Sequence, residues 1–126
     1  MVLVDTSVWV EHLRSGSAEL QALLNDGEVV CHPFVIGELA CGNLKNRAEI
    51  IDLLHALPRS TKADDHEILL FIDRQRLRGR GLGLIDVHLL ASCLLDGSRL
   101  WSNDKPLKAV ATDLNIDGSQ GDGGRV

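Results

Sequence analysis

The chain has 126 residues, with 13 basic and 18 acidic side chains and a net charge of −5. This length predicts one domain, and 44% hydrophobic residues with 25% charged residues are typical of a globular protein rather than a disordered one. The acidic balance excludes nucleic-acid binding through bulk charge, and an aromatic content of 3% excludes a base-stacking platform. We also expect no secretory signal, no membrane span and, with three widely spaced cysteines, a reducing cytoplasm rather than a disulfide framework.

The first half of the chain opens with an apolar run over residues 1–4, which predicts a buried parallel strand ending at Asp5. Thr6 or Ser7 can cap a helix that reaches Leu13. The elements expected next are a helix beginning at Ser17, a strand over 28–31, a helix opened by Pro33, and a helix over 47–57 that ends at Pro58.

In the second half, a capping box formed by Asp64 and Glu67 predicts a long helix, which the glycine-rich segment 79–83 ends. The elements expected after it are a helix over 85–96, a strand over 99–102 and a helix beginning at Lys105-Pro106. Strands that alternate with helices predict an α/β domain with a mainly parallel sheet. Residues 117–126 are rich in glycine and lack apolar periodicity, so we expect the domain at 1–116 and a disordered tail after it.

Four acidic residues stand where such a domain collects ligands. Asp5 and Asp104 follow predicted strands, and ligands bind beyond the carboxyl ends of parallel strands. Glu38 and Asp86 lie on the apolar stripes of their helices, where an unpaired carboxylate is costly, and no Lys or Arg stands three or four residues away. Together these four carboxylates predict an oxygen-lined pocket suited to Mg²⁺, for which Mn²⁺ can substitute.

Three of the four acids also have a purely structural interpretation. Asp5 can cap a strand end, Asp86 can stabilise a helix N-terminus through the helix dipole, and Asp104 is an ordinary N-cap. Glu38 is the exception, because an acid in the middle of a helix has no capping role.

Four motifs, in order along the chain, resemble those of PIN-domain ribonucleases, and specifically of VapC toxins from type II toxin–antitoxin modules. The motifs are VLVDTSVW at 2–9, PFVIGEL at 33–39, GLIDVHLLA at 83–91 and LWSNDKPL at 100–107. The resemblance spans residues 2–116. The sequence departs from the family's pattern at Ser102, where Thr is commoner, and at Pro106-Leu107, where Asp-Phe is more usual.

The resemblance implies a PIN-like fold and a Mg²⁺-dependent endoribonuclease that is a homodimer and is silenced by a VapB-type antitoxin. The residues it implies for the metal site and its hydroxyl support are Asp5, Glu38, Asp86 and Asp104, supported by Ser7 and Ser102. The resulting hypothesis is in-line attack by a metal-bound water on an RNA phosphodiester. Glu38 either completes the ligand shell of the metal or orients the water.

The densest basic cluster is the run of arginines at positions 74, 76, 78 and 80. Arg78 and Arg80 border the third motif and are the predicted RNA contacts, although the strip can equally be a solvated helix face or meet a second subunit.

Two other functions stay open. One is an aspartyl phosphotransfer domain, which favours Asp-x-Asp where Ser7 stands, and the other is a non-catalytic protein-binding PIN-like module.

Overall fold

Three short parallel strands form the sheet of this protein, whose structure, a computed structural model, describes residues 1–120. The strand order is β2-β1-β3, with β1 at Val2–Val4, β2 at Val29–Val30 and β3 at Arg99–Trp101. Leu3 lies opposite Val30 on one side and Leu100 on the other. Since all three residues of β1 are buried, the apolar run predicted as a strand is the centre of the sheet.

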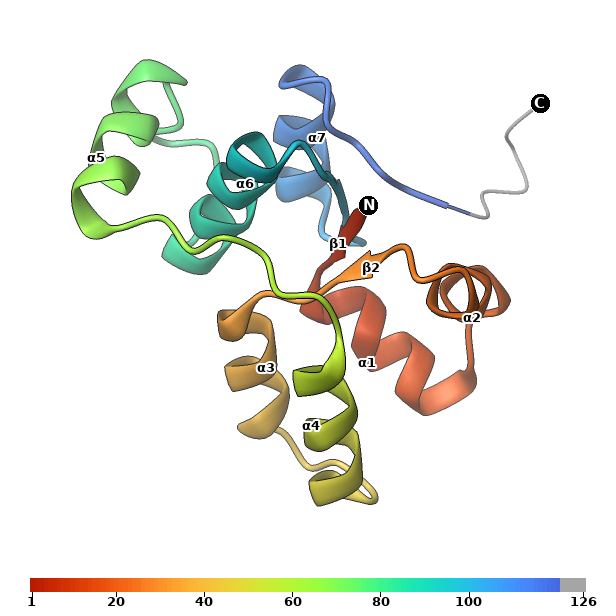
Figure 1. The fold of residues 1–126 in the computed structure, drawn as a ribbon. Coiled ribbons are helices and arrows are strands. Elements are labelled where there is room, and N and C mark those ends of the chain that lie inside the picture. The colour runs from red at the N-terminus through yellow and green to blue at the C-terminus, as the bar shows by residue number, and fades with distance from the viewer. Residues whose placement is uncertain (121–126) are drawn as a thin grey trace.

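Within residues 1–120, seven helices surround the sheet: α1 (Thr6–Ser15), α2 (Ala18–Asn25), α3 (Pro33–Ala40), α4 (Arg47–Ala56), α5 (Asp65–Arg74), α6 (Leu84–Asp96) and α7 (Lys105–Asp113). In Figure 1, α5, α6 and α7 occupy the upper part of the view, and α1, α3 and α4 the lower part. The arrangement is the α/β fold with a parallel sheet expected from the sequence. Within residues 1–120, no helix combines the length and the apolar character that a membrane crossing requires.

Local sequence signals set most helix ends where we expected them. Ser17 caps α2, Pro33 occupies the first turn of α3, and Asp64 and Glu67 form a reciprocal capping box at the start of α5. The first helix differs from the prediction. Its N-cap is Asp5 rather than Thr6 or Ser7, because the Asp5 carboxylate accepts a hydrogen bond from the first free N–H of the helix. The helix also runs two residues beyond Leu13, to Ser15.

The end of the folded part also differs from the prediction. The N–H of Leu100 donates to the carbonyl of Ile116 (2.8 Å), and the N–H of Gly118 donates to the carbonyl of Leu100 (2.7 Å). A Cβ on Gly118 would lie 2.9 Å from the Cβ of Arg99, so this close approach requires glycine. Asp117 and Gly118 therefore pair with β3 and do not belong to a disordered tail. The last part of that predicted tail, 121–126, lies outside the described residues.

A pair of buried histidines lies where α3 meets α6. The Nδ1 of His32 accepts a hydrogen bond from the N–H of Phe34 (3.0 Å), and the ring of His88 lies 6.2 Å from that of His32. Burial lowers the pKa of His32 to about 4, with a further contribution from His88 and Lys62, and burial also lowers the pKa of His88. Both rings are therefore neutral at neutral pH. Among the described residues, His32 Nε2 and His88 Nδ1 have no hydrogen-bond partner.

Candidate active site

Asp5 lies directly after β1 and is almost fully buried, with 6% of its surface exposed. Its Oδ1 accepts a hydrogen bond from the N–H of Thr6 (2.8 Å). Its Oδ2 accepts one from the Ser7 hydroxyl (2.8 Å) and one from the Ser102 hydroxyl (2.7 Å). Ser102 reaches Asp5 because it follows β3, which is the parallel neighbour of β1. Three donors thus satisfy a buried carboxylate and hold it in one orientation.

The two serine hydroxyls also fix the turn that carries the next acid. Ser7 Oγ accepts a hydrogen bond from the N–H of Asn103 (3.0 Å), and Ser102 Oγ accepts one from the N–H of Asp104 (3.0 Å). Each hydroxyl donates to Asp5 and accepts from the turn at 103–104. The end of β1 and the start of α7 are therefore joined through these two side chains.

Asp104 and Asp86 each lie at the start of a helix. Asp104 is the exposed N-cap of α7, and its Oδ2 accepts a hydrogen bond from the N–H of Leu107 (3.0 Å). The Pro-Leu departure from the family's pattern is compatible with this cap, because proline in the first turn needs no N–H partner. Asp86 is half-buried in the first turn of α6, and its Oδ2 accepts a hydrogen bond from the N–H of Gly83 (2.9 Å).

Glu38 projects from α3 and is exposed, so the prediction that it lies on the buried apolar face is wrong. The buried side of α3 is formed by Val35, Ile36 and Leu39. Glu38 lies at the margin of this short stripe, where the hydroxyl of Thr6 donates to its Oε1 (2.6 Å). The evidence that Glu38 belongs to the candidate site is therefore its position beside α1 and its contact with Thr6.

The four acids interact electrostatically along one edge of the sheet. Burial raises the pKa of Asp86, the hydrogen bond from Gly83 opposes this effect, and the negative charges of Asp5, Asp104 and Glu38 raise the pKa further. Within the described part of the chain, the ion pairs are those of the N-terminus with Glu28 and of Arg80 with Asp113. Hence no described Lys or Arg neutralises any of the four carboxylates.

The side chains as placed do not form a finished metal site. Across residues 1–120, no three His, Cys, Asp or Glu side chains are grouped closely enough to hold a metal ion. Each of the four carboxylates is instead turned toward a hydroxyl or backbone donor close to it. Glu38 Oε2, Asp86 Oδ1 and Asp104 Oδ1 accept no hydrogen bond from any described residue. Such oxygens, on carboxylates that repel one another, are the donor set that fits a hard divalent cation.

The sequence did not predict three polar side chains at this edge: Thr6, Asn103 and Glu11. Thr6 contacts two of the acids at once, through its N–H to Asp5 and its hydroxyl to Glu38. Asn103 donates from Nδ2 to Oε2 of Glu11 (2.9 Å), which places a fifth carboxylate next to the turn at 103–104. The available signal for Glu11 was its position four residues after Ser7, on the same side of α1.

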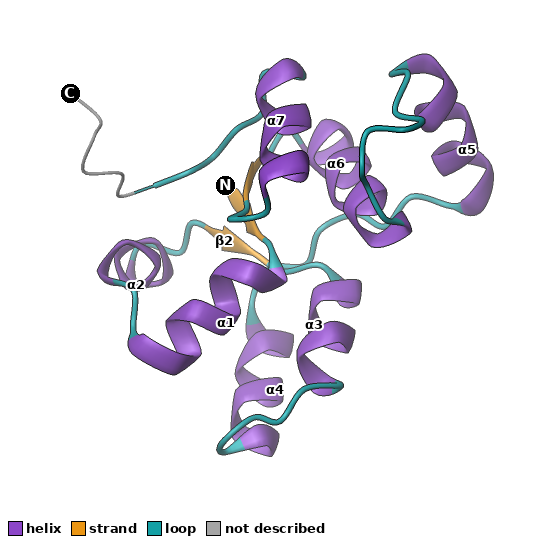
Figure 2. Cartoon of the chain, turned by 180° about the vertical axis from the view of Figure 1, so that it is seen from behind, coloured by secondary structure: helices purple, strands orange, loops and turns teal. Residues whose placement is uncertain are grey.

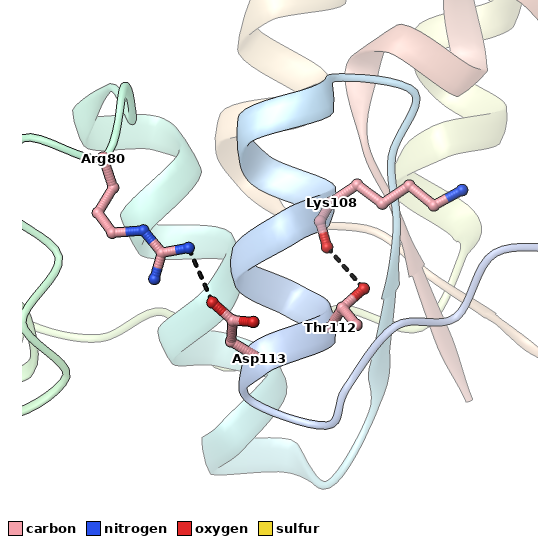
Figure 3. A network of polar contacts seen from close by, with 4 residues as sticks. All are labelled: Arg80, Lys108, Thr112 and Asp113. Carbon is pink, nitrogen blue, oxygen red and sulfur yellow. Dashed lines mark hydrogen bonds and ion pairs between the residues drawn. The ribbon is translucent and has the colours of Figure 1, made fainter.

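The two arginines predicted to contact RNA have different surroundings. Arg80 Nη2 pairs with Oδ2 of Asp113 on α7 (2.8 Å), and on the same helix the Thr112 hydroxyl donates to the carbonyl of Lys108 (3.0 Å, Figure 3). Arg78 lines a polar pocket of about 350 Å³ together with Arg76 and residues 72–73.

The loop that carries these arginines lies against the start of α7. Gly81 adopts φ +79°, which favours glycine, and a Cβ there would lie 3.5 Å from the Cβ of Pro106. Pro106 is two residues from Asp104. The loop that follows the arginines therefore reaches the acidic edge, although the guanidinium of Arg80 is already paired with Asp113.

Comparison with known proteins agrees with this architecture. The family model of the PIN domain matches residues 2–113. The chain is 49% identical, over 117 residues, to Ribonuclease VapC32 of Mycobacterium tuberculosis, from both strain CDC 1551 / Oshkosh and strain H37Rv. Each match covers 92% of this chain and 94% of the relative.

Solved structures with the same fold share little sequence with this chain. The structure of FitAcB from Neisseria gonorrhoeae has a TM-score of 0.62 at 17% identity and covers 89% of this chain and 94% of its own. FitAB bound to an IR36 DNA fragment has a TM-score of 0.60 at 15% identity, with coverages of 89% and 91%. PAE2754 from Pyrobaculum aerophilum has a TM-score of 0.59 at 17% identity, with coverages of 86% and 78%. The chain belongs to the PIN-domain family and, within it, to the VapC group.

Proposed function

We propose that this protein is the toxin of a type II toxin–antitoxin module, a Mg²⁺-dependent endoribonuclease that hydrolyses RNA phosphodiester bonds. One observation carries the proposal: four carboxylates interact electrostatically along the carboxyl edge of a parallel sheet, and no described cation of the protein neutralises them. The name of the relative, Ribonuclease VapC32, supports the same activity.

In this proposal Asp5, Asp86 and Asp104 hold the metal, and Glu38 either completes its ligand shell or orients the attacking water. When bound, Mg²⁺ would polarise the phosphoryl oxygens and lower the pKa of a water that attacks in line. Asp5 is held by the hydroxyls of Ser7 and Ser102, so its orientation is set before any ligand arrives. Burial and, to a smaller extent, the charges of Asp5, Asp104 and Glu38 raise the pKa of Asp86, and a bound cation would favour its charged form.

Glu38 is the candidate for moving the proton of the attacking water. Its Oε1 is held by the Thr6 hydroxyl at 2.6 Å, which leaves Oε2 without a described donor. An exposed carboxylate held at one oxygen can orient a water and accept its proton at the other. Thr6 acts as a positioning residue in this step.

RNA binding is assigned to Arg78 and Arg80. Arg78 forms no described ion pair, so its guanidinium is available to a phosphate. Arg80 must exchange Asp113 for a phosphate or share its donors between the two. Because the whole chain is acidic, this strip would supply the positive charge that the backbone of RNA requires.

The partners proposed with this activity come from the family: a VapB-type antitoxin and a second copy of the chain in a homodimer. The proposed site of action is the cytoplasm.

The phosphotransfer alternative is not supported by the geometry. Both oxygens of Asp5 accept hydrogen bonds and the side chain is 6% exposed, which is unfavourable for a nucleophile.

The test compares the parent protein with Asp86→Asn on total cellular RNA, with Mg²⁺ and with EDTA, followed by mapping of the new RNA ends. We expect cleavage at defined positions by the parent with Mg²⁺, and a loss of about 100-fold or more both with EDTA and in Asp86→Asn. Cleavage that survives EDTA, or an Asp86→Asn variant as active as the parent, would refute the proposal. A parent that binds Mg²⁺ but never cleaves RNA would favour the protein-binding module.

A further inference from the structure

Four of the buried polar atoms that have no described hydrogen-bond partner come from two parts of the chain that pack together. They are Nε2 of His32, Nδ1 of His88, and the hydroxyl oxygens of Ser60 and Ser92. All four residues are at most 4% exposed. An unpaired buried polar atom is costly, and nearly all such atoms in proteins bond to a protein group or to internal water. None of the four residues is among the proposed catalytic or RNA-binding residues.

One side of α6 supplies two of these atoms. His88, Ser92 and Asp96 follow one another at intervals of four residues, so they lie along the same side of the helix. At the end of this row, Oδ2 of Asp96 accepts a hydrogen bond from the N–H of Thr61 (2.9 Å). In both views the loop that follows α4 passes between α3 and α6 on its way to α5 (Figure 2). The side of α6 that carries His88 and Ser92 therefore faces this loop.

The same loop lies beside the end of β2, which supplies the other two atoms. The N–H of Cys31 donates to the carbonyl of Pro58 (2.8 Å), and the N–H of Ser60 donates to the carbonyl of Cys31 (3.1 Å). His32 follows Cys31 directly and is the N-cap of α3. The hydroxyl of Ser60 and the ring of His32 thus belong to one paired backbone segment that packs against α6.

The two histidine rings carry complementary hydrogen-bonding groups. Nδ1 of His32 accepts from the N–H of Phe34 (3.0 Å), so the proton of this neutral ring lies on Nε2, which is a buried donor. His88 is also neutral, and its Nδ1 is an acceptor when the proton lies on Nε2. The ring centroids are 6.2 Å apart. A direct N–H···N bond requires centroids within about 5.5 Å, whereas one bridging water spans up to about 7 Å.

We propose that His32 and His88 bind one internal water molecule, which accepts a hydrogen bond from Nε2–H of His32 and donates one to Nδ1 of His88. Its second proton would be donated to the hydroxyl of Ser92, on the same side of α6. Three hydrogen bonds are typical of an internal water. The water would join the N-cap of α3 to α6, beside the contact between the rings of Phe34 and His88 (centroids 4.7 Å apart). The inference does not depend on RNA cleavage.

The first test is a crystal structure of the full chain. We expect an electron-density peak at about 2.7–3.2 Å from both Nε2 of His32 and Nδ1 of His88. Two results would overturn the proposal. One is a pair of rings in direct contact with no peak between them. The other is a peak at about 2.0–2.1 Å from both nitrogens, which would identify a metal ion instead.

NMR of the ¹⁵N-labelled protein tests the same site in solution. Long-range ¹H–¹⁵N spectra should place the proton on Nε2 in both rings, and the Nε2 proton of His32 should show a cross-peak to a bound water. His12 is the matched control, because its Nδ1 also accepts from a backbone N–H, that of Ser17 (3.0 Å), but its ring is only half-buried. The Nε2 proton of His12 should exchange with solvent too fast to be seen. A proton on Nδ1 of His88 would contradict the proposed bridge.

A double-mutant cycle measures whether the two rings depend on each other. His88→Phe keeps a ring but removes the acceptor, and His32→Asn keeps an N-cap acceptor but removes the buried Nε2–H. Near neutral pH, His88→Phe should lower the folding equilibrium constant of the parent at least about tenfold, and that of His32→Asn about fivefold less. In His12→Asn the effect of His88→Phe should equal that in the parent. Urea unfolding measures these constants. An equal effect of His88→Phe in parent and His32→Asn, or a gain of stability in His88→Phe, would overturn the proposal. If a variant does not fold, the crystal structure and the NMR spectra of the parent decide.

Discussion

Asp86 and His88 lie close together on α6, but they belong to two ionisable groups in different surroundings: the acidic edge of the sheet and the buried histidine pair. Asp86 faces the acidic edge in the first turn of the helix, and His88, two residues later, faces the interior beside His32. Burial disfavours the charged form of each, so it raises the pKa of Asp86 and lowers that of both histidines. At the acidic edge, the negative charges of the other three acids raise the pKa of Asp86 further. In the interior, one ring nitrogen of each histidine has no hydrogen-bond partner among the described residues.

The difference shows what each group is suited for. At the edge, three carboxylates have an oxygen free of described donors, and a cation would relieve their repulsion. Around His32 and His88, burial and the charge of Lys62 outweigh the attraction of Asp96 and Asp65, so these rings contribute packing and helix capping in the neutral form.

The largest effect expected is on activity, from Asp5→Asn. The substitution keeps the size of the side chain and one acceptor oxygen but removes the charge, so RNA cleavage should fall about 100-fold or more. The loss of one of four repelling charges offsets part of the weakened hydrogen bonding with Ser7 and Ser102, so the variant should remain folded, which urea unfolding without metal checks. The matched control is the exposed Asp52→Asn on α4, which should cleave RNA at the parent's rate. Equal losses in both variants would contradict a specific role of the edge.

The next effect is on stability, from the pH dependence of His32. The unfolded histidine binds a proton below about pH 6.5, but the folded one does so only near its pKa of about 4. Stability should therefore be complete above pH 6.5 and fall by on the order of 2 kcal/mol as the pH drops toward 4. His32→Asn keeps an N-cap acceptor for Phe34 and does not titrate, so its unfolding free energy should vary less over this range. Urea unfolding at each pH measures the unfolding free energy of the parent and of His32→Asn. The same pH dependence in the two proteins would show that His32 is not the group responsible.

A smaller effect is expected at Ser102, whose hydroxyl joins the ends of β1 and β3. Its hydroxyl donates to Asp5 and accepts from Asp104, so Ser102→Ala should cost about 1 kcal/mol of stability and reduce cleavage about tenfold. Ser102→Thr restores the hydroxyl and should recover most of both. A Thr variant as impaired as the Ala variant would attribute the loss to packing.

The smallest effect is expected at the basic strip. Arg80 and Asp113 are an exposed ion pair, so Arg80→Gln should change stability by less than about 0.5 kcal/mol. If both arginines contact RNA, Arg78→Gln and Arg80→Gln should each weaken RNA binding and reduce its salt dependence. Binding is measured on Asp86→Asn, which is not expected to cleave the RNA. Unchanged salt dependence in both variants would leave the strip as a solvated surface.

The sequence predicted the parts of the fold that depend on near neighbours. The caps at Ser17 and Asp64, the proline that opens α3 and the parallel strands all follow from local patterns. The pairing of Asp117 and Gly118 was missed, because it uses backbone groups and a close approach that side-chain periodicity does not report.

The candidate site was predicted as a set of residues more completely than as a geometry. Glu38 was placed on a buried face because its neighbours in α3 are apolar, but a short helix exposes the margin of such a stripe. Its real partner, the hydroxyl of Thr6, is 32 residues away in the chain. The Asn103–Glu11 contact, across 92 residues, likewise depends on two strands lying side by side.

The most direct test of the account is a crystal structure of the protein soaked with Mn²⁺, with the metal located by its anomalous scattering. The account predicts a peak at the carboxyl edge of the sheet, coordinated by Asp5 and Asp86 together with Glu38 or Asp104, and no such peak in Asp86→Asn crystals. An edge that holds no metal in the parent, with all four carboxylates still bonded to their local donors, would contradict it.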